Sequence, residues 1–269
     1  MSQQLVNKAE ISIPDISHFV IEDDTPVDNF QSEKQQRLLV DPLYSSKVLS
    51  TPFIAAANVG LFYAVKQDPI VPDAFLSLKV QMPADWSERK NRSYFVWEFG
   101  KVPEVAIEVV SNREGKELDS KKADYARIGV TYYAVFDPLR QIQEPERMDG
   151  SLLKVFGLTQ GRYVESLPSW LETVGLGLTI WEGEFEEQPG LWLRWCDQNG
   201  QIILTGKERA DQEQQRADQE QQRADRLAEQ LGAMGIDPDE IRTYALTAKR
   251  RSALNVSQQC QMVLDERRN

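Results

Sequence analysis

The feature that most constrains this chain is an acidic residue inside an apolar run. Residues 105–110 read Val-Ala-Ile-Glu-Val-Val, so Glu108 lies among β-branched and small apolar neighbours. Such a run is typical of a strand that is covered on both faces of a sheet. Because burying a carboxylate is costly unless it has a partner, Glu108 needs a cation or a hydrogen-bond donor beside it. The run therefore predicts a buried strand and a polar site together.

The residues after this run predict a crossover between parallel strands. Helical periodicity extends from about residue 114 to residue 128, and Gly129 follows as the expected helix C-cap. Residues 131–136, which read Thr-Tyr-Tyr-Ala-Val-Phe, return as a strand. Strand, helix and strand of these lengths form a right-handed connection between parallel strands. The fold class of the core is therefore α/β.

Short apolar runs predict further strands on both sides of this unit, and a helical pattern covers residues 31–39. An Asn199-Gly200 step also predicts a hairpin that pairs residues 191–195 with residues 201–204. The other expected strands are residues 53–57, 61–65, 70–80, 152–156 and 175–181, and residues 94–97 are expected to form either another strand or an ordered insertion.

Composition divides the chain into four parts. Residues 1–30 are polar and acidic and are expected to form an N-terminal arm, whereas residues 31–204 carry the α/β pattern. Residues 205–232 repeat the unit Arg-Ala-Asp-Gln-Glu-Gln-Gln, and such a repeat of seven favours a coiled coil. Its seam holds alanine and glutamate, so an exposed helix or a weak dimerising arm is expected. Residues 233–269 are expected to form a C-terminal helical extension.

The cysteines and the histidine limit the chemistry. Cys196 and Cys260 are far apart in sequence and support neither a disulfide framework nor a thiolate metal site. The lone histidine, His18, has no Ser or Cys motif near it, which disfavours histidine-based acid–base catalysis and zinc binding. Any catalytic metal must therefore be held by oxygen atoms.

The net charge of −11 opposes a large nucleic-acid footprint, because phosphate binding depends on lysine and arginine. A local basic cluster is nevertheless present at Arg113, Lys116, Lys121, Lys122 and Arg127. No apolar run approaches the roughly 20 residues that cross a bilayer, and the first residues lack a signal-peptide stretch. A cytoplasmic protein without membrane contact is expected.

A second acid precedes another apolar strand. Pro72-Asp73 opens the run that continues to Val80. Two acids on adjacent strands, with Lys121 on the helix that follows, are the elements of a site that holds Mg²⁺ against a phosphodiester.

The stretch from about residue 70 to residue 138 resembles the Uma-type endonucleases of the PD-(D/E)XK restriction-endonuclease-like superfamily. The residues that carry the resemblance are Pro72-Asp73, Glu108-Val-Val-Ser111, Lys121 four residues before Tyr125, Gly129-Val130, and the aromatic strand that ends in Asp137-Pro138. The resemblance implies a restriction-endonuclease-like nuclease domain in residues 31–204, with a central mixed β-sheet flanked by helices. It also implies a metal-dependent endonuclease that hydrolyses phosphodiester bonds of nucleic acid, with DNA as the expected substrate.

Carried over to this chain, the resemblance makes Asp73 and Glu108 ligands of Mg²⁺ or Mn²⁺, with the backbone carbonyl of Val109 as a third oxygen. The usual lysine of the superfamily lies two residues after the glutamate, where this chain has Val110. Lys121 would replace that lysine from the helix, to hold or deprotonate the attacking water and to offset charge on phosphorus.

Other positions are less directly implied. The histidine of the first helix in the family is absent here, and Glu33 or Gln36 would contribute in its place. Glu117 stands where the family often has Asp and is interpreted as a partner of Lys121 on the helix face. The expected contacts with nucleic acid are Arg113, Lys116 and Lys122.

Two other functions stay open. The first is a catalytically inactive nuclease-fold scaffold that forms a homodimer or binds partners through its C-terminal helix. The second is a phosphoester hydrolase of small nucleotides, which would suit the acidic composition better. A carboxylate pair without a lysine in reach would favour the scaffold, and a closed pocket would favour the small substrate.

Overall fold

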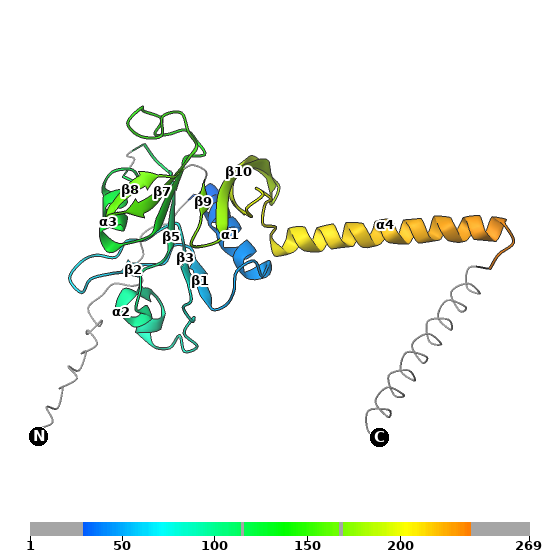
Figure 1. Ribbon diagram of the computed structural model, residues 1–269, viewed down its shortest axis with the longest axis horizontal. Helices are drawn as coiled ribbons and strands as arrows, with labels where there is room; N and C mark the ends of the chain where they lie inside the picture. The colour runs from blue at the N-terminus through cyan, green and yellow to red at the C-terminus, as the bar shows by residue number, and fades with distance from the viewer. Residues whose placement is uncertain (1–28, 114–115, 167–168, 238–269) are drawn as a thin grey trace, which may run out of the picture. The chain divides into compact units, whose positions relative to one another are not determined.

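The computed structural model describes residues 29–113, 116–166 and 169–237 (Figure 1). The chain divides into two compact units, Met1–Gly206 and Lys207–Asn269. The predicted N-terminal arm, except for its last two residues, and most of the predicted C-terminal extension lie outside the described residues.

The centre of the first unit is a six-stranded sheet in the order β1-β3-β5-β6-β7-β8. Its strands are β1 (Phe53–Ala56), β3 (Ala74–Leu78), β5 (Val105–Val109), β6 (Tyr132–Phe136), β7 (Leu153–Thr159) and β8 (Arg162–Glu165). The strands β5 and β6 pair in parallel, whereas the other neighbours are antiparallel. The predicted α/β core with a central mixed sheet is therefore confirmed.

The crossover from β5 to β6 forms as predicted. Helix α3 (Ser120–Ile128) joins the two strands, and Gly129 ends it with a φ of 92°, a left-handed conformation that suits glycine. Every residue of β5 is buried, which is the pattern of a strand covered on both faces. The helix starts later than the periodicity indicated, because residues 116–119 form a turn instead.

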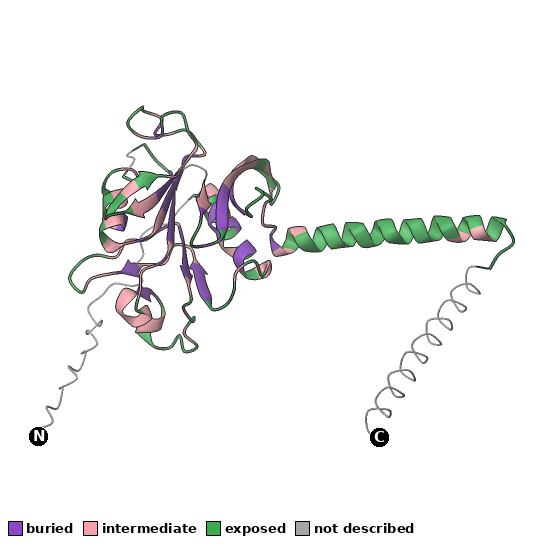
Figure 2. Cartoon of the chain, in the orientation of Figure 1, coloured by how far each residue is buried: buried purple, intermediate pink, exposed green. Residues whose placement is uncertain are grey.

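Apolar side chains cover both faces of the sheet, and Figure 2 shows buried residues concentrated along its strands. On one face, α1 (Phe30–Ser45) contributes Leu39 and Leu43 to a core that contains Ile107. On the other face, Tyr125 of α3 packs in a core with Ala106. Since strand side chains alternate between faces, Glu108 lies on the same face as Ala106, under α3.

A second, three-stranded sheet has the order β11-β10-β9 and consists of β9 (Trp170–Leu171), β10 (Leu176–Phe185) and β11 (Gln188–Cys196). The predicted hairpin of residues 191–195 with 201–204 forms only next to its turn, where the N–H of Ile203 donates to the carbonyl of Trp195 at 2.9 Å. Along most of their length residues 191–195 pair with β10 instead. The Asn199-Gly200 turn does form, with a φ of 76° at Gly200, but only one bridge, Cys196 with Ile202, follows it in the described residues.

A smaller two-stranded sheet contributes Leu61 and Tyr94 to the same core as Ala106. Strands β2 (Leu61–Phe62) and β4 (Tyr94–Phe95) pair in parallel, and α2 (Val96–Phe99) follows directly. A 3₁₀ turn, η1 (Arg89–Asn91), precedes β4. Both strands are shorter than the sequence predicted.

Helix α4 (Gly206–Ala233) spans 28 residues and has no buried residue. It coincides with the predicted heptad-like segment, and its self-association stays a prediction. No helix in the described part of the chain is long and apolar enough to cross a membrane.

A chain that ends before Gly206 should melt within a few degrees of the full chain. Because α4 has no buried residue, its removal exposes little apolar surface and takes little stabilisation from the core. Thermal unfolding followed by circular dichroism measures the difference. A large fall in melting temperature would instead mean that the helix stabilises the core or dimerises the protein.

Candidate active site

Two carboxylates face each other across β3 and β5. Ala74 pairs with Ile107, so the next step of this antiparallel register places Asp73 opposite Glu108. Asp73 accepts a hydrogen bond of 2.6 Å from the backbone N–H of Val109 through Oδ2. Gln36 of α1 donates to the other oxygen of Asp73, Oδ1, at 3.1 Å. The position of the Asp73 carboxylate is thus fixed from β5 and from α1.

Helix α3 supplies both partners of Glu108. The Nζ atom of Lys121 lies 2.7 Å from Oε2 of Glu108, and the hydroxyl of Tyr125 donates to Oε1 at 2.7 Å. Lys121 and Tyr125 are four residues apart and therefore lie on the same face of the helix. Glu108 is only 1% exposed, and a carboxylate buried in this way needs a cation or a hydrogen-bond donor beside it. Lys121 and Tyr125 are these partners.

The site is electrostatically coupled. Burial raises the pKa of Glu108 to about 8, although the Lys121 ammonium acts in the opposite direction. Burial lowers the pKa of Lys121, but the charge of Glu108 and its hydrogen bond outweigh this effect and raise that pKa overall. Lys121 therefore stays an ammonium at neutral pH. A cation bound near Glu108 would favour the ionised carboxylate in the same way.

Asp73, Glu108 and Lys121 border a hollow of about 180 Å³. Its lining residues are Asp73, Glu108, Val109, Ser111, Asn112, Lys116, Glu117 and Lys121. Glu117 is only 6% exposed, and its Oε2 has no hydrogen-bond partner among the described residues. It lies in the turn before α3 instead of on the helix, so the helix-face interpretation of Glu117 is wrong. The predicted proximity of Glu117 to Lys121 is nevertheless present, because both residues line the hollow and the charge of Glu117 raises the pKa of Lys121.

Several predicted site residues lie elsewhere. Glu33 is paired with Arg37 on the exposed side of α1, 2.5 Å from its Nε atom. The ammonium of Lys122 lies 3.7 Å above the ring of Phe156, and Arg113 does not line the hollow. Of the predicted nucleic-acid contacts, Lys116 alone borders the carboxylates.

The donor set of the hollow fits Mg²⁺ or Mn²⁺. In the part of the chain that the structure describes, no group of three or more His, Cys, Asp or Glu side chains is placed to hold a metal. Mg²⁺, however, usually takes one or two carboxylates and completes its shell with water and phosphate oxygens. Asp73 and Glu108 would supply these carboxylates, and the hollow of about 180 Å³ would take the remaining ligands. The role of the Val109 carbonyl stays a prediction.

Replacing Tyr125 by phenylalanine should weaken metal affinity about tenfold, because groups that orient a ligand are typically worth 10- to 100-fold in affinity. The hydroxyl of Tyr125 is the donor to Oε1 of Glu108, and its loss frees that carboxylate to move. Tyr163→Phe is the matched control, since its hydroxyl donates to the carbonyl of Val130, away from the hollow. Isothermal titration with Mn²⁺ measures both variants. If Tyr125→Phe binds Mn²⁺ as tightly as Tyr163→Phe and wild type do, Tyr125 does not orient the carboxylate of Glu108.

Comparison with known proteins places the chain in a family. A family model described as "Uma2: Putative restriction endonuclease" matches residues 19–175, more than half of the chain. Among solved structures, the chain is similar to "a putative nuclease belonging to DUF820 from Anabaena variabilis ATCC 29413", with 15% identity and a TM-score of 0.37 over 54% of this chain and 73% of that one. No curated protein matches. The resemblance to the Uma-type endonucleases is therefore confirmed, and this chain belongs to the Uma2 family.

Proposed function

We propose that this protein is a divalent-metal-dependent endonuclease that hydrolyses phosphodiester bonds of nucleic acid, with DNA as its substrate. The observation that carries the proposal is the convergence of Asp73, Glu108 and Lys121 at one hollow. A carboxylate pair without a lysine would fit an inactive scaffold, whereas here the ammonium lies 2.7 Å from the buried acid. The family to which the chain belongs supports the same reading.

Each group has a distinct part in this reaction. Asp73 and Glu108 would hold Mg²⁺ or Mn²⁺, which supplies Lewis-acid polarisation of the phosphoryl group and lowers the pKa of bound water. Lys121 offsets the negative charge that develops on the phosphoryl oxygens. Its raised pKa favours this electrostatic role over removal of a proton from the attacking water.

Basic side chains near the hollow assist binding. Lys116 borders the carboxylates, and Arg113 lies in the same loop after β5. Their charge offsets part of the repulsion that a chain of net charge −11 exerts on phosphate.

The test is a cleavage assay on supercoiled plasmid and on single-stranded oligonucleotides, with Mg²⁺, with Mn²⁺ and with EDTA. Nicking or cutting that requires a metal is the expected result. A pure wild-type protein that cuts no nucleic acid with either metal would discard the enzyme and leave the inactive scaffold.

A further inference from the structure

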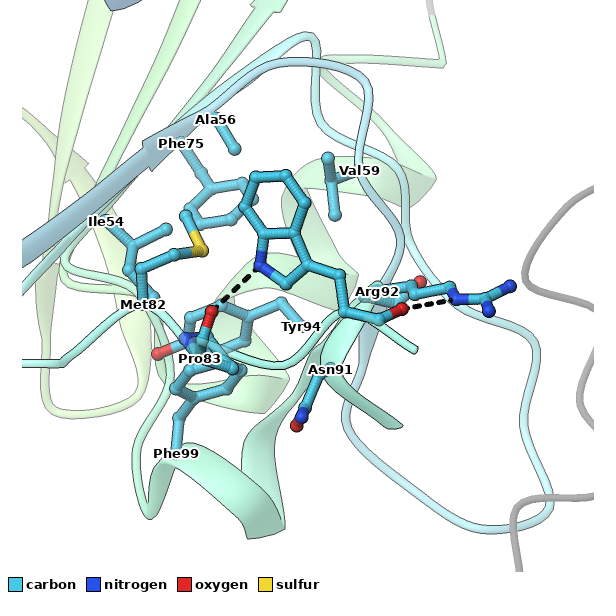
Figure 3. Close-up of a pocket in the computed structure, with 12 residues that line it drawn as sticks. Ile54, Ala56, Val59, Phe75, Met82, Pro83, Asn91, Arg92, Tyr94 and Phe99 are labelled. Atoms are coloured by element: carbon cyan, nitrogen blue, oxygen red, sulfur yellow. Dashed lines mark hydrogen bonds between the residues drawn. The ribbon is translucent and has the colours of Figure 1, made fainter. Parts of the chain in front are cut away.

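A second and larger cavity has a volume of about 490 Å³ (Figure 3). Its residues Ile54, Phe75 and Tyr94 pack in the same core as Ala106, so the cavity lies on the face of the sheet that carries Glu108. Its floor is formed by the buried side chains Ile54, Phe75 and Tyr94, and its mouth by Met82, Trp86 and Arg92. The volume lies within the range of cavities that hold small ligands. None of these residues takes part in the proposed hydrolysis, so the cavity calls for its own explanation.

Residues next to each other in the chain line the cavity and the proposed active site. Asp73 immediately precedes β3, and Phe75, two residues further along the chain, is the second residue of that strand. The backbone N–H of Asn58 reaches the carbonyls of both Pro72 and Asp73 at 3.3 Å. The next residue, Val59, lines the cavity. A nucleotide that reaches this cavity is therefore a neighbour of one whose phosphate lies at Asp73.

The walls of the cavity suit a flat aromatic ring. Phe75 and Tyr94 meet edge to face at 5.3 Å, and Tyr94 stacks on Phe99 at 4.4 Å. The Tyr94 hydroxyl is occupied by Ser77 and by the carbonyl of Lys101, so that residue presents an apolar ring. A planar base with two π faces is recognised by such aromatic side chains whatever its sequence.

Trp86 is an exposed wall of the cavity, with 64% of its surface accessible. Its indole N–H donates to the carbonyl of Pro83 at 2.8 Å, which holds the ring at the mouth. A large aromatic side chain left in water, beside an apolar cavity, is typical of a binding surface.

The guanidinium of Arg92 is hydrogen-bonded to the backbone next to this ring. Arg92 donates through Nε to the carbonyl of Trp86 at 2.9 Å and through Nη2 to that of Ser87 at 3.1 Å. An aromatic cavity with a guanidinium at its mouth matches a nucleotide, whose base is apolar on its faces and whose phosphate is anionic.

We propose that this cavity, formed by Ile54, Phe75, Met82, Trp86, Arg92 and Tyr94, holds one unstacked nucleobase of the strand whose phosphate lies at the Asp73–Glu108 site. The inference rests on the proposed nuclease function and deepens it. A base inside a duplex cannot reach such a cavity without being extruded, at a cost in stacking and pairing. The protein should therefore bind single strands, or unpaired bases next to a duplex, more tightly than an intact duplex.

The test is a scan with abasic sites in a short fluorescent single-stranded oligonucleotide. The full chain binds each oligonucleotide in EDTA, where a metal-dependent enzyme does not cut, and fluorescence anisotropy gives the affinity. One abasic position should weaken binding about tenfold, as expected for the loss of one stacked base. Trp86→Ala should weaken binding of the intact oligonucleotide to the same extent and remove the effect of that abasic position.

Two further variants control this experiment. Trp86→Phe keeps an aromatic face and should restore most of the affinity. Phe30→Ala removes another exposed aromatic side chain, 89% accessible, on the helix that packs against the opposite face of the sheet, and should bind like wild type. Because Trp86 is mostly exposed, its variants should keep the wild-type melting temperature, which is measured alongside.

The outcomes separate this inference from the nuclease. If no abasic position matters, or if Trp86→Ala responds to abasic sites as wild type does, the base pocket is discarded, whereas metal-dependent cleavage by wild type would keep the nuclease. If one abasic position weakens binding only when Trp86 is present, but the wild-type protein cleaves no nucleic acid, the base pocket is supported and the nuclease proposal fails. An apolar dye that perturbs Trp86 where no oligonucleotide does would also overturn the inference.

Discussion

Lys121→Ala is expected to lower metal-dependent cleavage by on the order of a hundredfold, since one transition-state contact in a preorganised site is typically worth about 3 kcal/mol. The ammonium lies 2.7 Å from Glu108, inside the hollow that the scissile phosphate would enter. Metal affinity should stay roughly intact, because the variant keeps both carboxylates and removes a positive charge that repels the cation. Initial cleavage rates at saturating metal measure the effect.

Lys122→Ala is the matched control for this prediction. Neighbouring helix residues point about 100° apart, and the Lys122 ammonium packs on the ring of Phe156 at 3.7 Å. The variant should cleave like wild type and lose only the small stabilisation of a cation–π contact, about 1 kcal/mol. Equal cleavage rates in Lys121→Ala and wild type would keep the nuclease and discard the role of this lysine.

The strands next to the site could be predicted because a strand that is buried on both faces appears in the sequence as a continuous run of apolar residues. The run of residues 105–110 must be apolar on both faces, and its single acid identifies the position where a partner is required. The i, i+4 spacing of Lys121 and Tyr125 then places both donors above Glu108. Local periodicity was enough for this part of the site.

The hairpin between β10 and β11 could not be predicted in the same way. Its turn is formed by Glu186 and Glu187, whose φ values of 48° and 65° lie in a region that glycine or asparagine usually occupies. The carboxylate of Glu186 bonds to Arg37 and Lys34 of α1, so tertiary contacts accompany this unfavourable turn. Asn199-Gly200 gave the stronger local signal, although the segment after it adds only one bridge.

Whether the remaining residues lie at the site depends on how the helices pack, and the spacing of residues along the sequence does not show this. Glu33 and Gln36 are three residues apart on α1, yet Gln36 reaches Asp73 and Glu33 pairs with Arg37. Which of them faces the sheet is decided by how α1 packs on it. Glu117 reaches the hollow because the chain forms a turn before α3, where periodicity predicts helix.

Removal of either carboxylate is expected to abolish measurable binding of Mg²⁺ and Mn²⁺. Asp73 and Glu108 are the two carboxylates that would bind the cation. Losing either one removes a negative charge and a group that holds the water ligands of the metal in place. Asp73→Asn and Glu108→Gln are preferred to alanine, because Glu108→Ala would leave a buried ammonium and hydroxyl without their partner. Breaking a buried ion pair in that way costs about 3–5 kcal/mol and could unfold the site.

Glu33→Gln is the control for the carboxylate variants, because its carboxylate is paired with Arg37 on the exposed side of α1. It should bind Mn²⁺ as wild type does in isothermal titration, whereas Asp73→Asn and Glu108→Gln should give no heat of binding. Thermal unfolding of each variant separates loss of a ligand from loss of the fold. Wild-type affinity in both Asp73→Asn and Glu108→Gln would show that the metal is not held by this pair of carboxylates.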